Sequence, residues 1–248
     1  MTAKLLLLAL GCFVLSASSA KLDGKVYGGQ NAAAGQFPYQ VSIQLNNQLH
    51  CGGSIIGPNV ILTAAHCVYN FGINQLKVVA GTTNLLAGNG VVRAVQRYVY
   101  HEYYKRTGND MDYDIAIVWV TQPFAYSSLI SQISMPSANS QTTTGPATLS
   151  GFGMTGPNSS PSPYLQWATV NIEPYTTCQN YGQYTARMIC ASVTGWPNAC
   201  PGDSGGPLVK GGLLVGVVSW GYGCGNQAPG FYCNVPSYRT WIYQQCGI

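Results

Sequence analysis

The sequence predicts an all-β domain, either a sandwich or a barrel, that ends in one α-helix. Short runs of alternating apolar and polar residues recur along the chain, and Gly, Pro, Asn and Ser residues separate them. Short strands at regular spacing, bounded by turn residues, are typical of sandwiches and barrels. At 248 residues the chain is long enough for one large all-β domain or two smaller ones.

Seven segments carry the strand pattern. In order, they are Gln40–Leu45, Val60–Thr63, Leu76–Val79, Val91–Val99, Ile115–Val120, Gln166–Ile172 and Leu213–Trp220. The stretch Ser134–Pro146 is rich in Pro, Ser and Thr, which favour turns over strands. We expect it to form a surface connection between two barrel halves.

The C-terminal tail has helical rather than strand spacing. Tyr238, Trp241 and Ile242 recur at the period of an α-helix. Ser237 precedes them and is predicted to cap the start of this helix, and Gly247 is predicted to follow its end.

The composition is unusually poor in charge. Charged residues make up 7% of the chain and hydrophobic residues 46%, against roughly 25% charged in an average soluble domain. This excludes a disordered or fibrous protein. The formal net charge is only +4. Because no basic cluster is present to neutralise phosphates, nucleic acid is not expected as a partner.

Residues 1–20 have the order of a secretory signal peptide. Lys4 precedes an apolar run from Leu5 to Leu15, and small residues lead to the expected cleavage point after Ala20. The run is too short to span a bilayer. We therefore expect a secreted, extracellular protein with no membrane anchor. One of the nine cysteines lies in this segment, and the other eight form an even set suited to disulfides in an oxidising compartment.

Three motifs carry chemistry. They are LTAAHC at Leu62–Cys67, DYDIA at Asp112–Ala116 and NACPGDSGGP at Asn198–Pro207. With Cys51-Gly52-Gly53-Ser54 ahead of the first, they resemble the trypsin/chymotrypsin family of secreted serine proteases over residues 26–248. The resemblance implies two six-stranded antiparallel β-barrels with a C-terminal α-helix, and a serine endopeptidase made as a zymogen.

The resemblance assigns the catalytic triad to His66, Asp114 and Ser204. A serine hydroxyl needs a base within hydrogen-bond reach at neutral pH, and His66 is expected to be that base. Asp114 starts a buried strand and is expected to accept a hydrogen bond from the other imidazole nitrogen. The backbone N–H groups of Gly202 and Ser204 are expected to form the oxyanion hole.

Other histidines and acids near these motifs are expected to have no catalytic role. His50 and His101 have ordinary aromatic or polar neighbours and are predicted to lie on the surface or in side-chain packing. Asp110 and Asp112 precede the triad aspartate in a loop and are predicted to be solvated.

The resemblance also extends to zymogen activation. The segment Lys25-Val26-Tyr27-Gly28-Gly29 resembles the activation site of the family. We expect cleavage after Lys25 to discard a propeptide of residues 21–25, leaving the protease domain 26–248. The new amino terminus of Val26 would then form an ion pair with Asp203. An activating trypsin-like protease is therefore an expected partner, besides protein or peptide substrates.

The predicted specificity departs from that of trypsins. Asn198 stands six residues before the nucleophile, where trypsins carry an aspartate at the floor of the primary pocket. An uncharged amide gives a buried Arg or Lys no counter-ion, so its lost hydration is not repaid. Ser219, Trp220 and Gly221 resemble the segment that pairs with substrate backbone, and Gly230 matches a pocket-wall glycine. We expect a chymotrypsin-like preference for large neutral side chains, with trypsin-like cleavage after Arg or Lys as the alternative.

The resemblance implies three disulfides. They are Cys51–Cys67, Cys178–Cys190 and Cys200–Cys224. Cys233 and Cys246 match no family bridge, although their even number suggests a pair. About eight helical residues between them would hold their backbones more than roughly 7 Å apart. We therefore expect two free, buried thiols.

No metal or cofactor is expected. Some relatives bind calcium through acids in the loop after the histidine strand, but residues 72–100 contain no Asp or Glu, and three scattered histidines do not indicate zinc. We expect a monomer. A catalytically inactive secreted binding homologue is a weaker alternative, because all three triad residues are present. An esterase or lipase would order its triad differently along the chain. The sequence leaves open whether Asn158, in a glycosylation sequon, is modified, and how Pro201 affects the substrates accepted.

Overall fold

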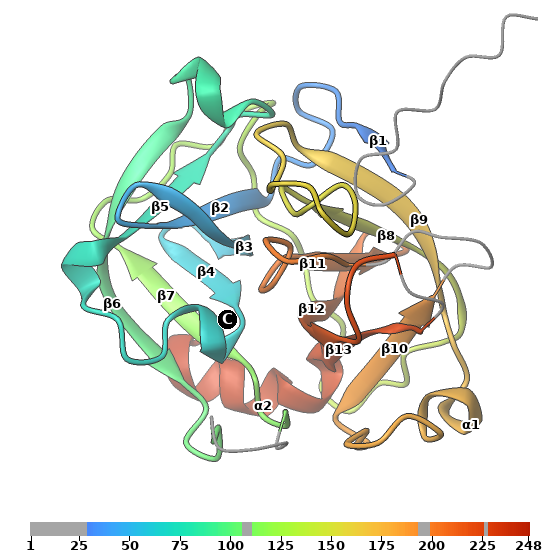
Figure 1. Cartoon of the computed structure of the whole chain (residues 1–248). Coiled ribbons are helices and arrows are strands. Elements are labelled where there is room, and N and C mark those ends of the chain that lie inside the picture. Colours follow the sequence, from blue (N-terminus) through green and yellow to red (C-terminus); the bar gives the residue numbers. More distant parts are fainter. Residues whose placement is uncertain (1–28, 106–110, 193–198, 226–227) are drawn as a thin grey trace, which may run out of the picture.

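The computed structural model describes residues 29–105, 111–192, 199–225 and 228–248. It contains two β-barrels side by side, with the C-terminal helix packed beneath the first of them (Figure 1). Among the described residues, no helix is both long and apolar enough to cross a membrane.

The first barrel is a closed ring of six antiparallel strands in the order β2-β3-β4-β7-β6-β5. Their bounds are β2 Gln40–Leu45, β3 Gln48–Gly57, β4 Val60–Thr63, β5 Leu76–Ala80, β6 Val91–Tyr100 and β7 Ala116–Val120. Three short 3-10 helices join them, at Ala65–Cys67 (η1), Ile73–Gln75 (η2) and Leu85–Ala87 (η3). Fully buried Ile43, Ile61 and Ile117 lie in its core, and their burial supplies the main driving force for closure.

The second barrel is also a closed ring of six antiparallel strands. Their bounds are β8 Gly145–Gly151, β9 Gln166–Ile172, β10 Met188–Ser192, β11 Pro207–Lys210, β12 Leu213–Gly221 and β13 Gly230–Asn234. The order is β9-β10-β13-β12-β11-β8, and pairing of β8 with β9 closes the ring. A short strand β1, Gln30–Asn31, adds to β9, and one helical turn, α1, spans Tyr175–Cys178. The predicted fold of two six-stranded barrels is confirmed.

The C-terminal helix α2 spans Val235–Cys246 and starts earlier than predicted. Ser237 is therefore not its cap, and that prediction is wrong. The cap position belongs to Asn234, and Pro236 fits the first turn because its missing N–H has no helical acceptor there. Gly247 ends the helix in a left-handed conformation, as predicted.

Helix α2 belongs to the second barrel by sequence but packs against the core of the first. Its buried residues Tyr238, Trp241 and Ile242 join the same apolar cluster as the first-barrel strands. The helix thus ties the two barrels together next to the loop that leads into β7.

Candidate active site

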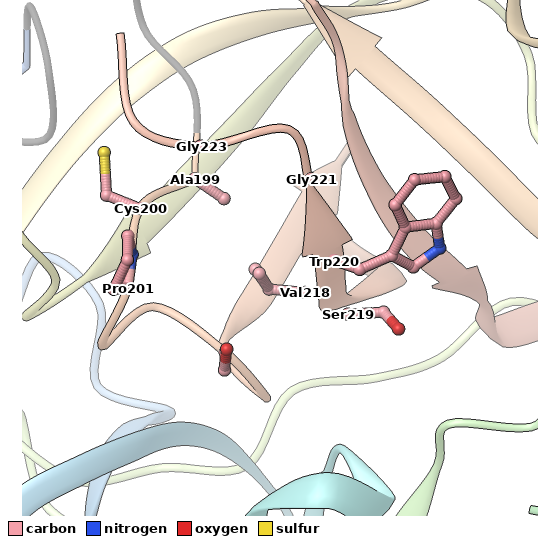
Figure 2. Close-up of a pocket in the computed structure, with 9 residues that line it drawn as sticks. Ala199, Cys200, Pro201, Val218, Ser219, Trp220, Gly221 and Gly223 are labelled. Atoms are coloured by element: carbon pink, nitrogen blue, oxygen red, sulfur yellow. The ribbon is translucent and has the colours of Figure 1, made fainter. Parts of the chain in front are cut away.

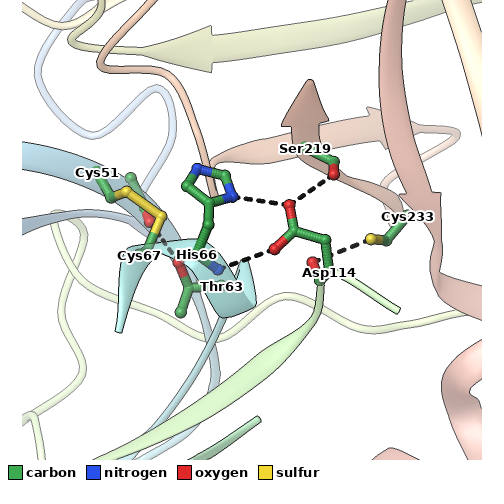
Figure 3. A network of polar contacts seen from close by, with 8 residues as sticks. Cys51, Thr63, His66, Cys67, Asp114, Ser219 and Cys233 are labelled. Atoms are coloured by element: carbon green, nitrogen blue, oxygen red, sulfur yellow. Dashed lines mark hydrogen bonds and ion pairs between the residues drawn. A yellow bond between two sulfur atoms is a disulfide. The ribbon is translucent and has the colours of Figure 1, made fainter. Parts of the chain in front are cut away.

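His66 and Asp114 lie side by side at the edge of the first barrel. His66 is on η1, just after β4, and Asp114 comes just before β7. Strands β4 and β7 are antiparallel neighbours with Thr63 opposite Ala116, so the end of one meets the start of the other. Nδ1 of His66 lies 2.7 Å from Oδ2 of Asp114, and the backbone N–H of His66 donates to Oδ1 at 2.9 Å (Figure 3). The carboxylate therefore fixes both the position and the orientation of the imidazole.

The second barrel holds the same carboxylate from the other side. The hydroxyl of Ser219, on β12, donates to Oδ2 of Asp114 at 2.6 Å. The thiol of Cys233, on β13, donates to the main-chain oxygen of Asp114 at 3.0 Å (Figure 3). Burial raises the pKa of the Cys233 thiol well above its ordinary value, which keeps its proton in place for this bond. Asp114 is only 3% exposed, and each of its oxygens is matched to a donor.

Ser204 lies in the turn before β11, at the junction of the barrels. Its carbonyl accepts a hydrogen bond from the backbone N–H of Gly52 on β3 at 2.7 Å. The next residue, Gly205, has a φ of 77°, and a Cβ there would lie 2.1 Å from Oγ1 of Thr63. Only glycine allows this close approach. The turn is thereby held against the two strands that precede His66.

The backbone N–H groups of this turn differ in their partners. Those of Asp203, Gly205 and Gly206 donate to internal carbonyl oxygens at 2.7–2.9 Å. Within the described part of the chain, no acceptor takes the N–H of Gly202 or Ser204. These two amides, predicted to form the oxyanion hole, are therefore available to a ligand.

A pocket of about 210 Å³ opens beside Ser204. Its other lining residues are Ala199, Cys200, Pro201, Val218, Ser219, Trp220, Gly221 and Gly223 (Figure 2). Of the two predicted wall glycines, Gly221 lines the pocket, and Gly230 lies opposite it on the neighbouring strand β13. The predicted floor residue, Asn198, lies outside the described residues.

Asp203 is fully buried next to Ser204. Its two oxygens accept backbone N–H groups from Gly153 at 2.7 Å and Cys200 at 3.0 Å. Burial outweighs these bonds and raises the pKa of Asp203 to about 6. A Cβ on Gly153 would lie 2.4 Å from this carboxyl group, so a side chain there would displace it. The predicted activation residues Lys25 and Val26 lie outside the described residues.

Asp112 is not solvated, and that prediction is wrong. It is 7% exposed and forms an ion pair with Arg187 from the second barrel. Sequence reasoning missed this pair because 75 residues separate its members. Asp110 lies outside the described residues. His101 and His50 do pack against aromatic rings, those of Trp241 and Phe71.

All three predicted disulfides are present. They are Cys51–Cys67, Cys178–Cys190 and Cys200–Cys224. Cys233 and Cys246 are free, as predicted. Cys233 is buried, but Cys246 is only half-buried, so the prediction of two buried thiols is wrong for Cys246, in the last turn of α2.

One group of metal-type ligands occurs in the described ranges, formed by Cys51, His66 and Cys67. Both of its cysteines are bonded to each other in a disulfide, so neither offers a thiolate to a metal.

The two barrels, with a histidine–aspartate pair and a serine at their junction, define the class of two-barrel serine proteases. A family model described as Trypsin matches residues 26–242, and the chain belongs to this family. It is therefore a serine endopeptidase that acts on peptide or protein substrates.

Several relatives support the same assignment. Trypsin alpha of Drosophila melanogaster is 42% identical, over 94% of this chain and 92% of its own length. Trypsin alpha-4 of Lucilia cuprina is 39% identical over similar shares, 94% and 92%. Among solved structures, neuropsin, a serine protease expressed in the limbic system of mouse brain, superposes with a TM-score of 0.81. It is 29% identical and covers 88% of this chain and 98% of its own.

Proposed function

We propose that this chain is a secreted serine endopeptidase that acts through Ser204, His66 and Asp114 and an acyl-enzyme. The observation that carries the proposal is the 2.7 Å contact between Nδ1 of His66 and Asp114, beside a pocket lined by Ser204. A fluorophosphonate probe tests it, because such probes label only activated serines. Labelling of the mature protein that is lost in Ser204→Ala supports the proposal, and labelling that persists in that variant overturns it.

In this mechanism the hydroxyl of Ser204 attacks the substrate carbonyl while Nε2 of His66 takes its proton. Asp114 accepts the Nδ1 proton and stabilises the imidazolium that forms. The N–H groups of Gly202 and Ser204 bind the oxyanion of the tetrahedral intermediate. His66 then protonates the leaving amine, and water hydrolyses the acyl-enzyme by the same route.

We further propose that the primary pocket prefers large neutral side chains. Asn198 supplies an amide rather than a carboxylate at the predicted floor, and Gly221, which lines the pocket, has no side chain to narrow it. The alternative is cleavage after Arg or Lys, which the trypsin names of the relatives favour. A cleavage profile on a peptide library separates the two.

Self-activation of the precursor is expected to be slow. Activation requires a cut after Lys25, but a pocket floored by Asn198 lacks the negative charge that pairs with a lysine ammonium. When purified precursor is incubated alone, Val26 should appear as a new amino terminus slowly or not at all. Added trypsin should produce it quickly, together with activity.

The converse variant is Asn198→Asp, which should raise cleavage after Arg and Lys relative to Tyr and Phe. Rapid, concentration-dependent self-processing of the unaltered precursor, absent in Ser204→Ala, would instead establish the trypsin-like alternative.

We propose that Asp203 receives the amino terminus of Val26 on activation. Its carboxyl group is fully buried, and within the described ranges no cationic side chain pairs with it. A buried carboxylate is costly without a counter-ion. An ammonium group delivered by cleavage would remove this cost and fix the turn that carries Ser204.

This ion pair predicts a pH-dependent difference in stability between precursor and mature protein. In the precursor, folding raises the pKa of Asp203 from 3.8 to about 6. The folded state then holds the proton more tightly than the unfolded state. The contribution of Asp203 to stability therefore falls as the pH rises from about 4 to about 6, by up to about 3 kcal/mol.

Urea unfolding at several pH values measures this contribution. The free energy of unfolding of the Ser204→Ala protein is compared with that of the Ser204→Ala, Asp203→Asn double variant. We expect the fall in the precursor and a much smaller one after cleavage at Lys25. Equal curves for the two forms would contradict the ion pair.

We propose secretion from the signal-like order of residues 1–20. Expression of the full chain in eukaryotic cells should place the processed protein in the medium, with the cut after Ala20. Retention in the cells would contradict it.

A further inference from the structure

Three elements meet at Asp112, two residues before the triad aspartate. Arg187 reaches it from the loop before β10, with Nε 3.2 Å from Oδ1 and 3.1 Å from Oδ2, and its terminal nitrogen also contacts Oδ2. Tyr238 of α2 donates its hydroxyl to Oδ1 at 3.3 Å. The loop that leads into β7 is thus hydrogen-bonded both to the second barrel and to the C-terminal helix.

Asp112 and Arg187 are both charged when they are in contact. Burial of Asp112 opposes its ionisation, yet the hydrogen bonds and charge of Arg187 hold the pKa of Asp112 below its ordinary value. The same contact raises the pKa of Arg187. A two-oxygen contact with a guanidinium fixes direction as well as distance, which a lysine ammonium does not. Asp112 is therefore both ionised and held in one orientation.

The residue between this pair and the triad aspartate is strained. Tyr113 has a φ of 58°, in the left-handed region that bulky residues rarely adopt. Its N–H donates to Oδ1 of Asp112 at 2.9 Å, and its ring lies 4.5 Å from the guanidinium of Arg187 and 4.7 Å from the ring of His101. Strain of this kind persists only where the surroundings enforce it.

We propose that Arg187 is a positioning residue: through Asp112 it holds Tyr113 in the left-handed conformation and thereby aims Asp114 at His66. The inference rests on the proposed triad. If the contact is lost, Tyr113 relaxes toward negative φ, and the peptide that enters Asp114 turns with it. The carboxylate then loses its simultaneous alignment with the ring and the backbone N–H of His66, which are 2.7 and 2.9 Å away.

The test is Arg187→Gln, which removes the charge and the two-oxygen contact. Displacements of about 1 Å at catalytic groups cost roughly 100-fold in rate. We expect kcat to fall by roughly 10- to 100-fold with KM nearly unchanged, because the pocket beside Ser204 does not include Arg187. Arg187→Lys should retain the charge and recover only part of kcat.

The most informative experiment asks whether a glycine at position 113 restores kcat. The double variant Arg187→Gln with Tyr113→Gly should regain much of the lost kcat, since glycine adopts positive φ without strain. Glycine also removes the packing of the tyrosine ring, so a purely structural role for Arg187 predicts a further loss instead. A further loss overturns the proposal.

The matched control is Arg93→Gln. Arg93 lies on β6, stacks over the ring of Phe124 and donates to main-chain oxygens nearby, as a structural arginine does. Compared with Arg187→Gln, we expect Arg93→Gln to lose a similar or smaller amount of stability. Its kcat should be unchanged when both variants are measured under conditions in which they are fully folded. Wild-type kcat in folded Arg187→Gln overturns the inference.

Failure of the inference and failure of the triad assignment are distinguishable. If Asp114→Asn loses activity while Arg187→Gln keeps it, the triad stands and only the positioning role falls. If Asp114→Asn keeps activity, both fall.

Discussion

Replacing Ser204 by alanine is expected to lower kcat for peptide hydrolysis by about 10⁶-fold. In the proposed mechanism the hydroxyl is the attacking group, and without it His66 has no proton to accept from the enzyme. The amides of Gly202 and residue 204 persist in the variant. Residual catalysis from the oxyanion hole and from substrate binding is therefore expected, at roughly 10³ to 10⁴ over the uncatalysed reaction.

The fold of this variant should be unchanged, because the main chain makes the contacts that hold the turn. The carbonyl of residue 204 still accepts the N–H of Gly52, and Gly205 still donates to Val218. Circular dichroism and urea unfolding check the fold, and hydrolysis of a peptide substrate checks kcat. Ser140→Ala is the control, since this serine donates to the main-chain oxygen of Ser137 in the connection that precedes β8, lines no part of the pocket beside Ser204, and should leave activity unchanged. Near wild-type activity in Ser204→Ala would rule out the nucleophile assignment.

Three strands have the bounds that the sequence predicts, although only one of them has two faces that differ along its whole length. Gln40–Leu45, Val60–Thr63 and Gln166–Ile172 have the predicted bounds, and the last of these alternates along its length between buried and more exposed residues. Alternation arises because successive side chains point to opposite faces of a strand. This alternation can be seen in the sequence where one face of the strand meets solvent.

The sequence pattern does not predict β13 or β3. Strand β13, Gly230–Asn234, is buried along almost its whole length, and β3 carries Gly52 and Gly53 in its middle. Neither has the period that marks a half-exposed strand. Gly52 lies against the turn of Ser204, where a Cβ would be 3.0 Å from Gly206, whereas Gly53 leaves room for Ile61 and Val41 inside the barrel.

The residues of the proposed triad lie in short sequence motifs, but the groups that hold Asp114 do not. Ser219 and Cys233 lie 105 and 119 residues further along the chain, in the other barrel. Their role depends on how β12 and β13 approach the first barrel, which local sequence does not encode. Cys233 was predicted as a free, buried thiol, yet its place as a hydrogen-bond donor to Asp114 emerged only from packing.

The second large effect is expected from Asp114→Asn, which should lower kcat by about 10⁴-fold near neutral pH. Both carboxylate oxygens accept hydrogen bonds: Oδ2 from Nδ1 of His66 and from Ser219, and Oδ1 from the backbone N–H of His66. Asparagine offers one acceptor oxygen and one donor NH₂ group. If the asparagine oxygen faces Nδ1, its NH₂ group faces the backbone N–H of His66. Two hydrogen-bond donors are then in contact with no acceptor between them.

The other orientation satisfies the backbone but places the NH₂ group against Nδ1. That nitrogen must then act as acceptor, so the ring proton moves to Nε2, and the imidazole is no longer a base toward Ser204. Because the first orientation opposes two buried donors, the second is favoured, and it disables His66 while nearly preserving side-chain volume; the loss should therefore appear mainly in kcat. Glu173→Gln is the matched acid-to-amide control: Glu173 accepts the hydroxyl of Ser192 at 2.5 Å in the second barrel, and its loss should leave kcat unchanged. Measured at neutral pH on one peptide substrate, an Asp114→Asn variant within tenfold of wild-type kcat would show that His66 does not depend on this carboxylate.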